Sequence, residues 1–310
     1  MLIQVKNILF IKINFEYNTV MNNFYRKYVP SLFLVPALVV LTVFFFIPFF
    51  DTIILSFKDY GTDIYNPTFV GFSNYVSILK SPEFYKTVIN SFIYLVVAVP
   101  PLIVIPLFLA ILLNREIRGL TLYKILIYLP VIVSIVVCAI AFKWLYAQTG
   151  ILNYCIQFFG GKPVEWLTNP DVALYSTIIV TVWKGVGYYM MIFLSALMSA
   201  PKELYEAAEV DGANFFQKHL SVSIPHLMPT IALVSTISAI SALKVFVEIY
   251  VMTKGGPMNG SKTIVYYIYE RAFESLDLGI ASAAAVILLI IVFAFSFVNI
   301  FFFEKEKYNL

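Results

Sequence analysis

Six long runs of uncharged, mostly apolar residues divide the chain. They cover residues 28–50, 87–114, 125–142, 172–201, 219–243 and 278–303, and Lys184 alone interrupts one of them. A helix needs about 20 residues to cross ~30 Å of hydrocarbon, whereas barrel strands would alternate over segments of about 10 residues. The pattern therefore predicts an all-α integral membrane protein with six transmembrane helices.

The composition agrees with a membrane location. Of the 310 residues, 61% are hydrophobic and 13% are charged, whereas a soluble domain has roughly 45–50% apolar and about 25% charged residues. The net charge of +3 is too small for a nucleic-acid-binding surface, so we expect membrane lipid and no nucleic acid around the protein. Two cysteines are too few for a disulfide scaffold. Since Cys138 lies inside the third run and Cys155 in a polar segment, we expect no bond between them.

Six spans place both termini on the same side of the membrane. With the N-terminus in the cytoplasm, 11 basic residues fall on the inner side and 8 on the outer side. Short segments next to the spans carry the most weight, and both Arg26–Lys27 and the Arg115–Arg118 turn are such segments. The bias predicts that both termini are cytoplasmic.

We expect three parts along the chain. These are a cytoplasmic N-terminal segment (1–28), a six-span domain (29–303) that includes the loop 199–225, and a cytoplasmic tail (304–310). Within the first part, the apolar stretch Ile8–Ile13 is too short to span, and no signal-peptide cleavage site follows it. Residues 1–20 are either an over-long gene start or an interfacial segment.

Motifs for catalysis, metals or cofactors are missing from the sequence. It contains neither His-Glu-x-x-His nor Gly-x-Ser-x-Gly, and we interpret His219 and His226 as interfacial side chains. Gly255–Thr263 resembles a phosphate-binding loop, but it has one extra residue before Lys262 and joins two membrane helices instead of a strand and a helix. We expect no enzymatic activity, so uphill transport would need an ion gradient or another chain.

The polar loop 199–225 predicts a short helix-turn-helix on the cytoplasmic face. Ser199 can cap the first helix, and Pro201 suits its first turn. Gly212 favours a stop, because glycine adopts the left-handed conformation at little cost. Phe215 and Phe216 begin a second short helical piece that ends at Pro225.

This loop has two possible locations: in the lipid headgroups, or docked on a partner protein. A helix in the headgroups would carry Lys and Arg on its polar face. The first helix instead carries Glu203, Glu206, Glu209 and Asp211 against one Lys202, so an anionic leaflet would repel it. The charge favours a partner protein that receives the helix in a groove.

The residues of this loop match a known family. Glu206-Ala207-Ala208, Asp211-Gly212-Ala213 and the closing Val222–Pro225 resemble the Glu-Ala-Ala signature of permease subunits of binding-protein-dependent ABC importers. The segments that resemble its carbohydrate branch, with maltose-type and glycerol-phosphate-type permeases, are Trp183–Tyr188, Leu194–Leu197, Pro201–Tyr205 and Phe246–Ile268. The chain departs from that branch at Val247, Glu248 and Lys254, which puts the transfer of substrate contacts in doubt.

The resemblance implies a transport subunit for a sugar, oligosaccharide or polyol in a prokaryotic cell membrane. Its implied partners are a second permease subunit, expected to be a different chain, two ATPase subunits and an extracytoplasmic solute-binding protein. The residues that it implies for ATPase coupling are Glu206, Ala207, Ala208, Asp211 and Gly212. The alternatives are a non-sugar solute on the same machinery and, from another class, an ion-coupled secondary carrier.

Several span residues are candidates for the substrate path. They are Trp183, Lys184, Tyr188, Tyr189, Lys244, Phe246 and Glu248. Lys184 lies near mid-depth and has either a cavity role or a helix-contact role, while Lys244 and Glu248 are spaced to pair with each other. The aromatic rings could stack on sugar faces, but rings are so common here that core or lipid positions are the more ordinary interpretation.

Overall fold

A computed structural model describes residues 32–61, 66–115 and 119–307 of the chain. The predicted N-terminal segment 1–28 lies outside the described residues, as does the end of the predicted tail 304–310. The chain divides after Ile54 into two units. The described part of the first unit is a helical run from Leu32 that contains η1 (Thr42–Phe46) and continues through α2 (Ile47–Leu55).

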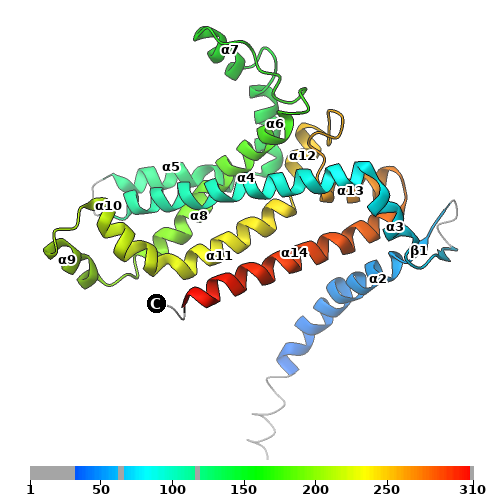
Figure 1. Cartoon of the computed structure of the whole chain (residues 1–310), viewed down its shortest axis with the longest axis horizontal. Coiled ribbons are helices and arrows are strands. Elements are labelled where there is room, and N and C mark those ends of the chain that lie inside the picture. Colours follow the sequence, from blue (N-terminus) through cyan, green and yellow to red (C-terminus); the bar gives the residue numbers. More distant parts are fainter. Residues whose placement is uncertain (1–31, 62–65, 116–118, 308–310) are drawn as a thin grey trace, which may run out of the picture. The chain divides into compact units, whose positions relative to one another are not determined.

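The second unit is built almost wholly of helices (Figure 1). A two-stranded antiparallel ribbon, β1 (Lys58–Asp59) and β2 (Thr68–Phe69), precedes them. The helices before the loop 199–225 are α3 (Ser73–Lys80), α4 (Pro82–Leu113), α5 (Leu120–Ile132), α6 (Ile135–Leu145), α7 (Ile151–Phe158) and α8 (Ala173–Leu197). Those that follow are α9 (Lys202–Val210), α10 (Phe215–Lys218), η2 (His219–Ser223), α11 (Ile224–Leu243), α12 (Val247–Met252), α13 (Ile264–Tyr269), η3 (Glu270–Glu274) and α14 (Leu278–Lys307).

Within the described residues, five helical stretches are long and apolar enough to cross a membrane. They are Leu32–Leu55, Pro82–Leu113, Ala173–Leu197, Phe215–Met252 and Leu278–Asn299, and the bent pair α5 and α6 makes a sixth if it counts as one span. Each stretch overlaps one predicted run. The structure therefore confirms an all-α membrane fold and gives five or six spans.

The third predicted span is not a straight helix, which corrects the expectation for residues 125–142. Its two halves, α5 and α6, are bent by 95° at a short break. Val133 and Ser134 are extended there, with ψ near 138° and 137°. Pro130 precedes the break and cannot donate a backbone hydrogen bond, so the helical ladder is already weakened where the chain turns.

The fifth span is also interrupted. Helix α11 ends at Leu243 and α12 begins at Val247. The expectation that Lys244 and Glu248 pair as i and i+4 neighbours is therefore wrong, because that spacing brings side chains together only within one helix. By contrast, α4 runs unbroken through Pro100, Pro101 and Pro106.

Helices α4, α8 and α11 form the core of the second unit. Tyr94, Met190, Phe193, Leu227 and Leu243 are all fully buried among them. Glycine makes the close packing of α8 possible. A Cβ on Gly185 would lie 2.7 Å from Leu102 of α4, and one on Gly187 would lie 2.3 Å from the Ile127 carbonyl oxygen of α5. Both glycines therefore stand where a neighbouring helix approaches the backbone closely.

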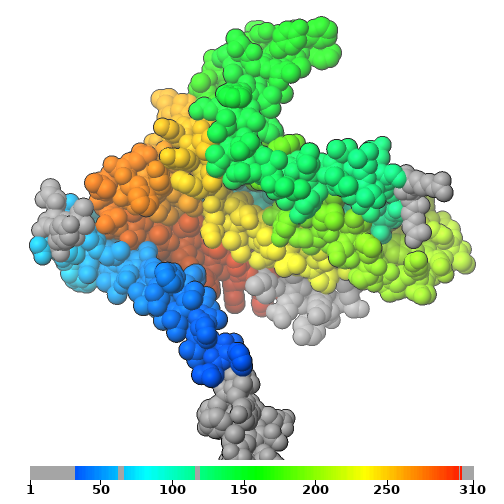
Figure 2. Space-filling model, turned by 180° about the vertical axis from the view of Figure 1, so that it is seen from behind, coloured from blue at the N-terminus to red at the C-terminus, as the bar shows by residue number. Residues whose placement is uncertain are grey.

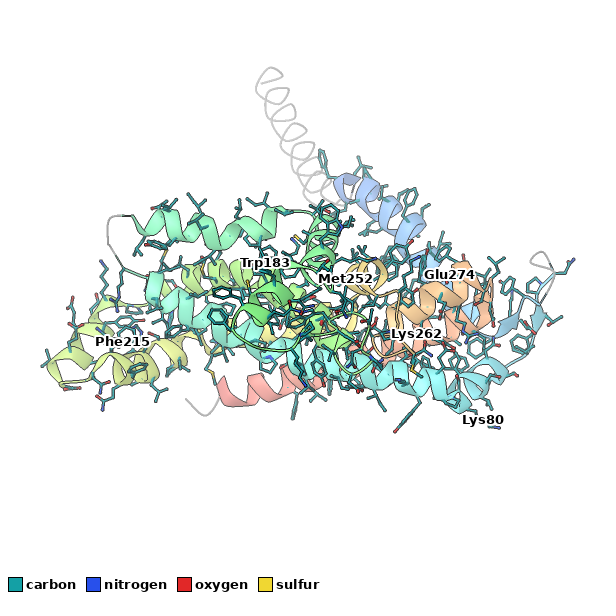
Figure 3. The ribbon with its side chains drawn as sticks, turned by 90° about the horizontal axis from the view of Figure 1, so that it is seen from above. Lys80, Trp183, Phe215, Met252, Lys262 and Glu274 are labelled. Carbon is teal, nitrogen blue, oxygen red and sulfur yellow. The ribbon has the colours of Figure 1, made fainter. Side chains whose placement is uncertain are left out.

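The helices of this unit run between two opposite ends (Figure 1). One end holds the α4–α5 turn together with α9 and α10, and α14 runs toward that end. The opposite end holds α3 and α13. Figure 3 shows the same separation, with Phe215 at one end, Lys80 at the other and Trp183 between them. The loop 199–225 therefore lies well away from α3 and α13.

Candidate functional site

The turn after α9 has the geometry predicted from its glycine. Gly212 has a φ of +76°, a conformation that most L-residues avoid. Its N–H donates to the Glu209 carbonyl (3.1 Å), and the Ala213 N–H donates to the Ala208 carbonyl (3.0 Å). This is the Schellman pattern, which satisfies the last carbonyls of a helix and reverses the chain.

The start of α9 differs from the prediction. The Ser199 hydroxyl donates to the Ala196 carbonyl at 2.7 Å, so it binds the end of α8 and does not cap α9. Pro201 occupies the cap position with no side-chain hydrogen bond. Proline is suited to that place because its missing N–H would have no helical partner there. Glu203 lies in the first turn, as expected for an acidic residue near the positive end of the helix dipole.

Side chains of η2 and α10 hold α9 in place. The Tyr205 hydroxyl contacts the Ser223 hydroxyl at 2.8 Å, and His219 Nδ1 contacts the same hydroxyl at 2.7 Å. Lys218 forms an ion pair with Glu209 across the turn. His219 thus has a structural partner on its own helix, whereas His226 reaches toward the Ala196 carbonyl at 3.3 Å.

A reciprocal capping box begins α10. The Gln217 N–H donates to the Asn214 side chain at 3.0 Å, and the Asn214 N–H donates to the Gln217 side chain at 2.9 Å. These bonds fix the start of α10, while the Lys218–Glu209 ion pair and the Tyr205–Ser223 contact join α9 to the elements that follow it. Together they make the helix-turn-helix a stiff unit.

Apolar side chains on this unit face outward. Leu204 is 50% exposed, Val210 is 88% exposed and Phe216 is 76% exposed. In Figure 2 the yellow-green surface of this region reaches the rim of the molecule. Of the five predicted coupling residues, Glu206, Ala207, Asp211 and Gly212 are exposed and Ala208 is half-buried.

A cavity of about 660 Å³ lies between this unit and the ends of the spans. Its lining includes Glu206 and Glu209 from α9, Phe215 from α10, and Arg115 and Lys124 from the α4–α5 region. The Arg115 guanidinium lies 5.3 Å from the centre of the Phe215 ring, a cation–π distance. The helix-turn-helix therefore contacts the span ends on one side and leaves its other side uncovered by the described residues.

Lys184 has a structural position in the middle of the unit. Its ammonium donates to the carbonyls of Pro130 (3.1 Å), Val131 (3.1 Å) and Val133 (2.7 Å). These carbonyls lie at the break between α5 and α6, where helical partners are lost. Of the two roles predicted for Lys184, the structure favours the helix contact.

Glu248 lies in a buried chain of hydroxyl groups. Its carboxylate accepts from the Thr181 hydroxyl at 2.8 Å, and the Tyr94 hydroxyl lies 2.6 Å from Thr181. Glu248 is only 9% exposed, while Lys244 is exposed at the end of α11. The sequence analysis missed Tyr94 and Thr181. The signal that could have found them is a tyrosine in the middle of an otherwise apolar run.

The predicted aromatic path residues do not share one surface. Trp183 is 44% exposed and packs against Phe142 at 5.1 Å between ring centres. Tyr189 is buried in the core, while Tyr188 is 43% exposed. Phe246 belongs to a different group of rings, which includes Tyr250 at 5.4 Å. Trp183 and Phe246 thus lie in two separate aromatic clusters, the first of which also contains Phe142, Tyr146 and Trp166.

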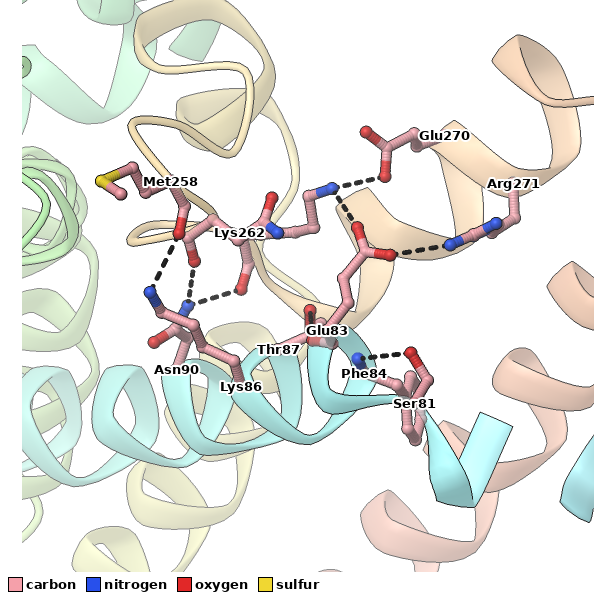
Figure 4. Close-up of polar contacts among 11 residues, drawn as sticks. Ser81, Glu83, Phe84, Lys86, Thr87, Asn90, Met258, Lys262, Glu270 and Arg271 are labelled. Carbon is pink, nitrogen blue, oxygen red and sulfur yellow. Dashed lines mark hydrogen bonds and ion pairs between the residues drawn. The ribbon is translucent and has the colours of Figure 1, made fainter. Parts of the chain in front are cut away.

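A network of ion pairs lies at the end opposite α9 (Figure 4). The Lys262 ammonium contacts Glu83 at 2.7 Å and Glu270 at 2.6 Å, and Arg271 contacts the second oxygen of Glu83 at 2.7 Å. Burial lowers the pKa of Lys262, but the bonds to Glu270 and Glu83 outweigh burial and raise it above its usual 10.5. The sequence analysis missed this network because its members lie far apart along the chain.

The network holds the Gly255–Thr263 loop in place. Asn90 on α4 donates to the carbonyls of Asn259 (2.9 Å) and Lys262 (3.0 Å), and Lys86 donates to that of Met258 (2.9 Å). The loop joins α12 to α13, and the Lys262 ammonium is already engaged by two carboxylates. Both facts argue against phosphate binding there, in agreement with the prediction.

Other potential chemistry is limited in the described residues. Cys138 and Cys155 are both free, as predicted. No group of three or more His, Cys, Asp or Glu side chains that could hold a metal is found in the described part of the chain.

Comparison with known proteins places these features in a family. Residues 68–304 match the model of the binding-protein-dependent transport system inner membrane component. The chain belongs to this family. It is therefore a permease subunit of an ABC transporter, a transport component that is embedded in the membrane.

Relatives and solved structures agree with this assignment. The chain is 33% identical over 262 residues to the arabinooligosaccharides transport permease AraP of Halalkalibacterium halodurans, covering 83% of this chain and 82% of that protein. It is 34% identical over 248 residues to the lactose transport permease LacF of Rhizobium radiobacter, covering 78% and 82%. A bacterial ABC transporter for import of the polysaccharide alginate shares the fold, with a TM-score of 0.81, 23% identity and coverage of 93% of this chain and 99% of that one.

Proposed function

We propose that this permease imports a sugar, oligosaccharide or polyol, driven by ATP hydrolysis on separate subunits. The named relatives that carry arabino-oligosaccharides and lactose support a carbohydrate, and the family description supports delivery by a solute-binding protein. In this proposal a second permease, expected to be a different chain, completes the path, and two ATPase subunits bind on the cytoplasmic side.

The observation that carries the coupling proposal is the exposed surface of α9 and its turn. Glu206 projects from a stiff helix-turn-helix beside Ala207, and Leu204, Val210 and Phe216 remain uncovered. A groove on another protein can bury apolar side chains of this kind and can also pair with an acidic side chain next to them. An ATPase bound to α9 would move the helix-turn-helix as one body, because the Schellman turn and the hydrogen bond between Tyr205 and Ser223 restrict internal motion.

The same proposal assigns sides to the membrane domain. The loop 199–225, the N-terminal segment 1–28 and the tail 304–310 lie in the cytoplasm, and the six-span domain covers 29–303. The cations Arg115, Lys124, Lys202 and Lys218, which line the cavity beside α9, support this orientation through the positive-inside rule.

A charge reversal on α9 tests the coupling. Glu206→Lys places a cation where the groove would meet a carboxylate, and we expect loss of ATPase co-purification and at least ~10-fold slower uptake, since interfacial charge pairs are worth several kcal/mol. The matched control is Glu165→Lys, an exposed acidic residue in the segment between α6 and α8.

Gly212→Pro should have the same effect as Glu206→Lys, because proline cannot adopt a positive φ and removes the N–H that binds Glu209. Gly212→Asn should retain activity, since asparagine tolerates that conformation. Normal coupled uptake by Glu206→Lys, or full transport by the permease without any ATPase, would refute the proposal.

A further inference from the structure

Four aromatic rings form one cluster between the fifth span and η3. Three of them are in mutual contact, since Phe246 also lies 5.1 Å from Tyr269 between ring centres. Phe246 lies at the break between α11 and α12 and contacts Tyr250 at 5.4 Å between ring centres. Tyr250 contacts Tyr269 of α13 at 5.2 Å, and Tyr269 contacts Phe273 of η3 at 5.3 Å. We call these four residues the aromatic ladder.

The ladder has a buried support and an exposed edge. Tyr266 is 2% exposed and lies 6.4 Å from Phe246 and 6.2 Å from Tyr269. Tyr250 and Phe273, in contrast, are 38% and 71% exposed. Core packing therefore accounts for Tyr266 but leaves the outer edge of the ladder without a partner among the described residues.

The ladder is accompanied by polar groups that hydrocarbon would exclude. Two of its four rings, Tyr250 and Tyr269, carry phenol hydroxyls. Burial, together with the nearby carboxylates of Glu274 and Glu270, raises the pKa of Tyr266 to about 12. Glu274 is exposed at the same end of the unit as Lys262 (Figure 3). An aromatic face next to the exposed carboxylate of Glu274 does not suit a lipid contact, because charge is expensive against hydrocarbon.

Rings combined with hydroxyls and carboxylates are suited to carbohydrate. A sugar ring presents C–H groups on its face, which pack on an aromatic face, and hydroxyls at its rim, which need polar partners. The ladder extends from Phe273 on η3 to Phe246, which is two residues from the exposed Lys244.

We propose that the aromatic ladder Phe246–Tyr250–Tyr269–Phe273, flanked by Glu274, is a sugar-binding surface that receives the solute at the outer side and leads it to the break in the fifth span. The network of Lys262, Glu83, Glu270 and Arg271 positions this surface, because it holds η3 and the Gly255–Thr263 loop against α4. The proposal rests on the carbohydrate function proposed above.

Saturation-transfer NMR on the full chain in lipid nanodiscs tests this surface. Lactose and maltotriose at millimolar concentration are the probes, and glycine betaine is the non-sugar control. We expect saturation transfer to the sugar C–H protons and about fivefold weaker binding for Tyr250→Ala and for Phe273→Ala, a loss typical of one aromatic contact. Tyr250→Phe should bind as the wild type does, because it keeps the ring.

Phe297→Ala is the matched control. Phe297 lies on α14 and is 71% exposed, as Phe273 is, but it is not part of the ladder. We expect it to bind sugar normally. Saturation transfer that is absent from the wild type, unchanged in both alanine variants, or lost equally in Phe297→Ala overturns the proposal.

The test is independent of the coupling proposal, since it needs no ATPase. If sugar binding is absent while Glu206→Lys still abolishes uptake, only the ladder fails. If sugar binds at the ladder while Glu206→Lys transports normally, only the coupling role fails.

Discussion

Lys184 illustrates how a single charged side chain can be accommodated within a membrane span. Its ammonium can donate three hydrogen bonds, and three backbone carbonyls at the α5–α6 break accept them. The ammonium supplies hydrogen-bond donors to carbonyls that the break between α5 and α6 leaves without helical partners. Such carbonyls need donors when no water is present. Glu248 is similarly satisfied by a hydroxyl from Thr181.

Removing the Lys184 ammonium should destabilise the protein. Lys184→Met keeps the length of the side chain but leaves these carbonyls without a donor, so we expect a loss of about 1–3 kcal/mol. The measurement is the thermal unfolding midpoint of the purified protein in detergent.

Lys143→Met is the control for Lys184→Met, since Lys143 makes a single long contact of 3.4 Å to the Val251 carbonyl. It should unfold close to the wild type. Equal midpoints for Lys184→Met and the wild type would show that the three hydrogen bonds contribute nothing.

At the scale of elements, polar side chains join segments that are distant in sequence. Lys262 connects the start of α4 with η3 through Glu83 and Glu270. The Lys262 side chain is only 5% exposed, so its charge is stabilised by these carboxylates and not by water. Tyr205 and Ser223 also join two elements, α9 and η2, through a hydrogen bond between their hydroxyls.

Breaking the Lys262 network should be costly and pH-dependent. Lys262→Met leaves Glu270 without its cation and Glu83 with Arg271 alone. We expect a loss of about 2–3 kcal/mol, below the value for a fully buried pair because Glu83 remains 27% exposed. Since the folded state raises the pKa of Lys262 above 10.5, the stabilisation is complete at neutral pH and disappears as pH rises through the raised pKa.

Thermal midpoints of the wild type and Lys262→Met measured across alkaline pH check the Lys262 prediction. The difference in thermal midpoint between the wild type and Lys262→Met should be constant near neutral pH and should disappear above pH 10.5. Lys218→Met, which breaks the ion pair with the 61% exposed Glu209, should cost at most about 1 kcal/mol. A gap that widens with rising pH contradicts the assignment.

At a larger scale, the long helices of the second unit separate the two ends for which we propose functions. The helix-turn-helix of α9 and α10 lies at one end, and the ion-pair network with the outer half of the aromatic ladder lies at the other (Figures 1 and 3). A transporter needs this separation, because energy is supplied on one side of the membrane and solute arrives from the other.

The native cysteines offer a direct test of sidedness. Cys155 on α7 is exposed and Cys138 is buried. A membrane-impermeant maleimide added to intact cells should therefore label Cys155 once the outer barrier, where present, is permeabilised. Cys155→Ser should abolish the signal.

The complementary probe is Asp211→Cys in the Cys155→Ser background, which should react only in inside-out vesicles. Labelling of Asp211→Cys from outside intact cells would place α9 on the wrong side for ATPase coupling.

Local features were predictable from the sequence. Membrane spans are visible as apolar runs, because hydrocarbon excludes charge from any segment that crosses it, whatever its neighbours are. The stop at Gly212 was also predictable, since a left-handed glycine closes a helix through hydrogen bonds within a few residues. The Glu206-Ala207-Ala208 and Asp211-Gly212-Ala213 motifs likewise indicated the permease family that the comparisons confirm.

Features that depend on distant segments were decided only by the tertiary structure. The sequence suggested that Lys244 and Glu248 pair, but the helix is interrupted after Leu243 and resumes at Val247. Glu248 accepts a hydrogen bond from Thr181 instead. Pro130 weakens the third span locally, but neither the 95° size of its bend nor its support by Lys184 follows from local composition. Each depends on which carbonyls, hydroxyls and carboxylates are brought within hydrogen-bonding distance when helices pack, and a one-dimensional pattern of apolar runs does not contain that information.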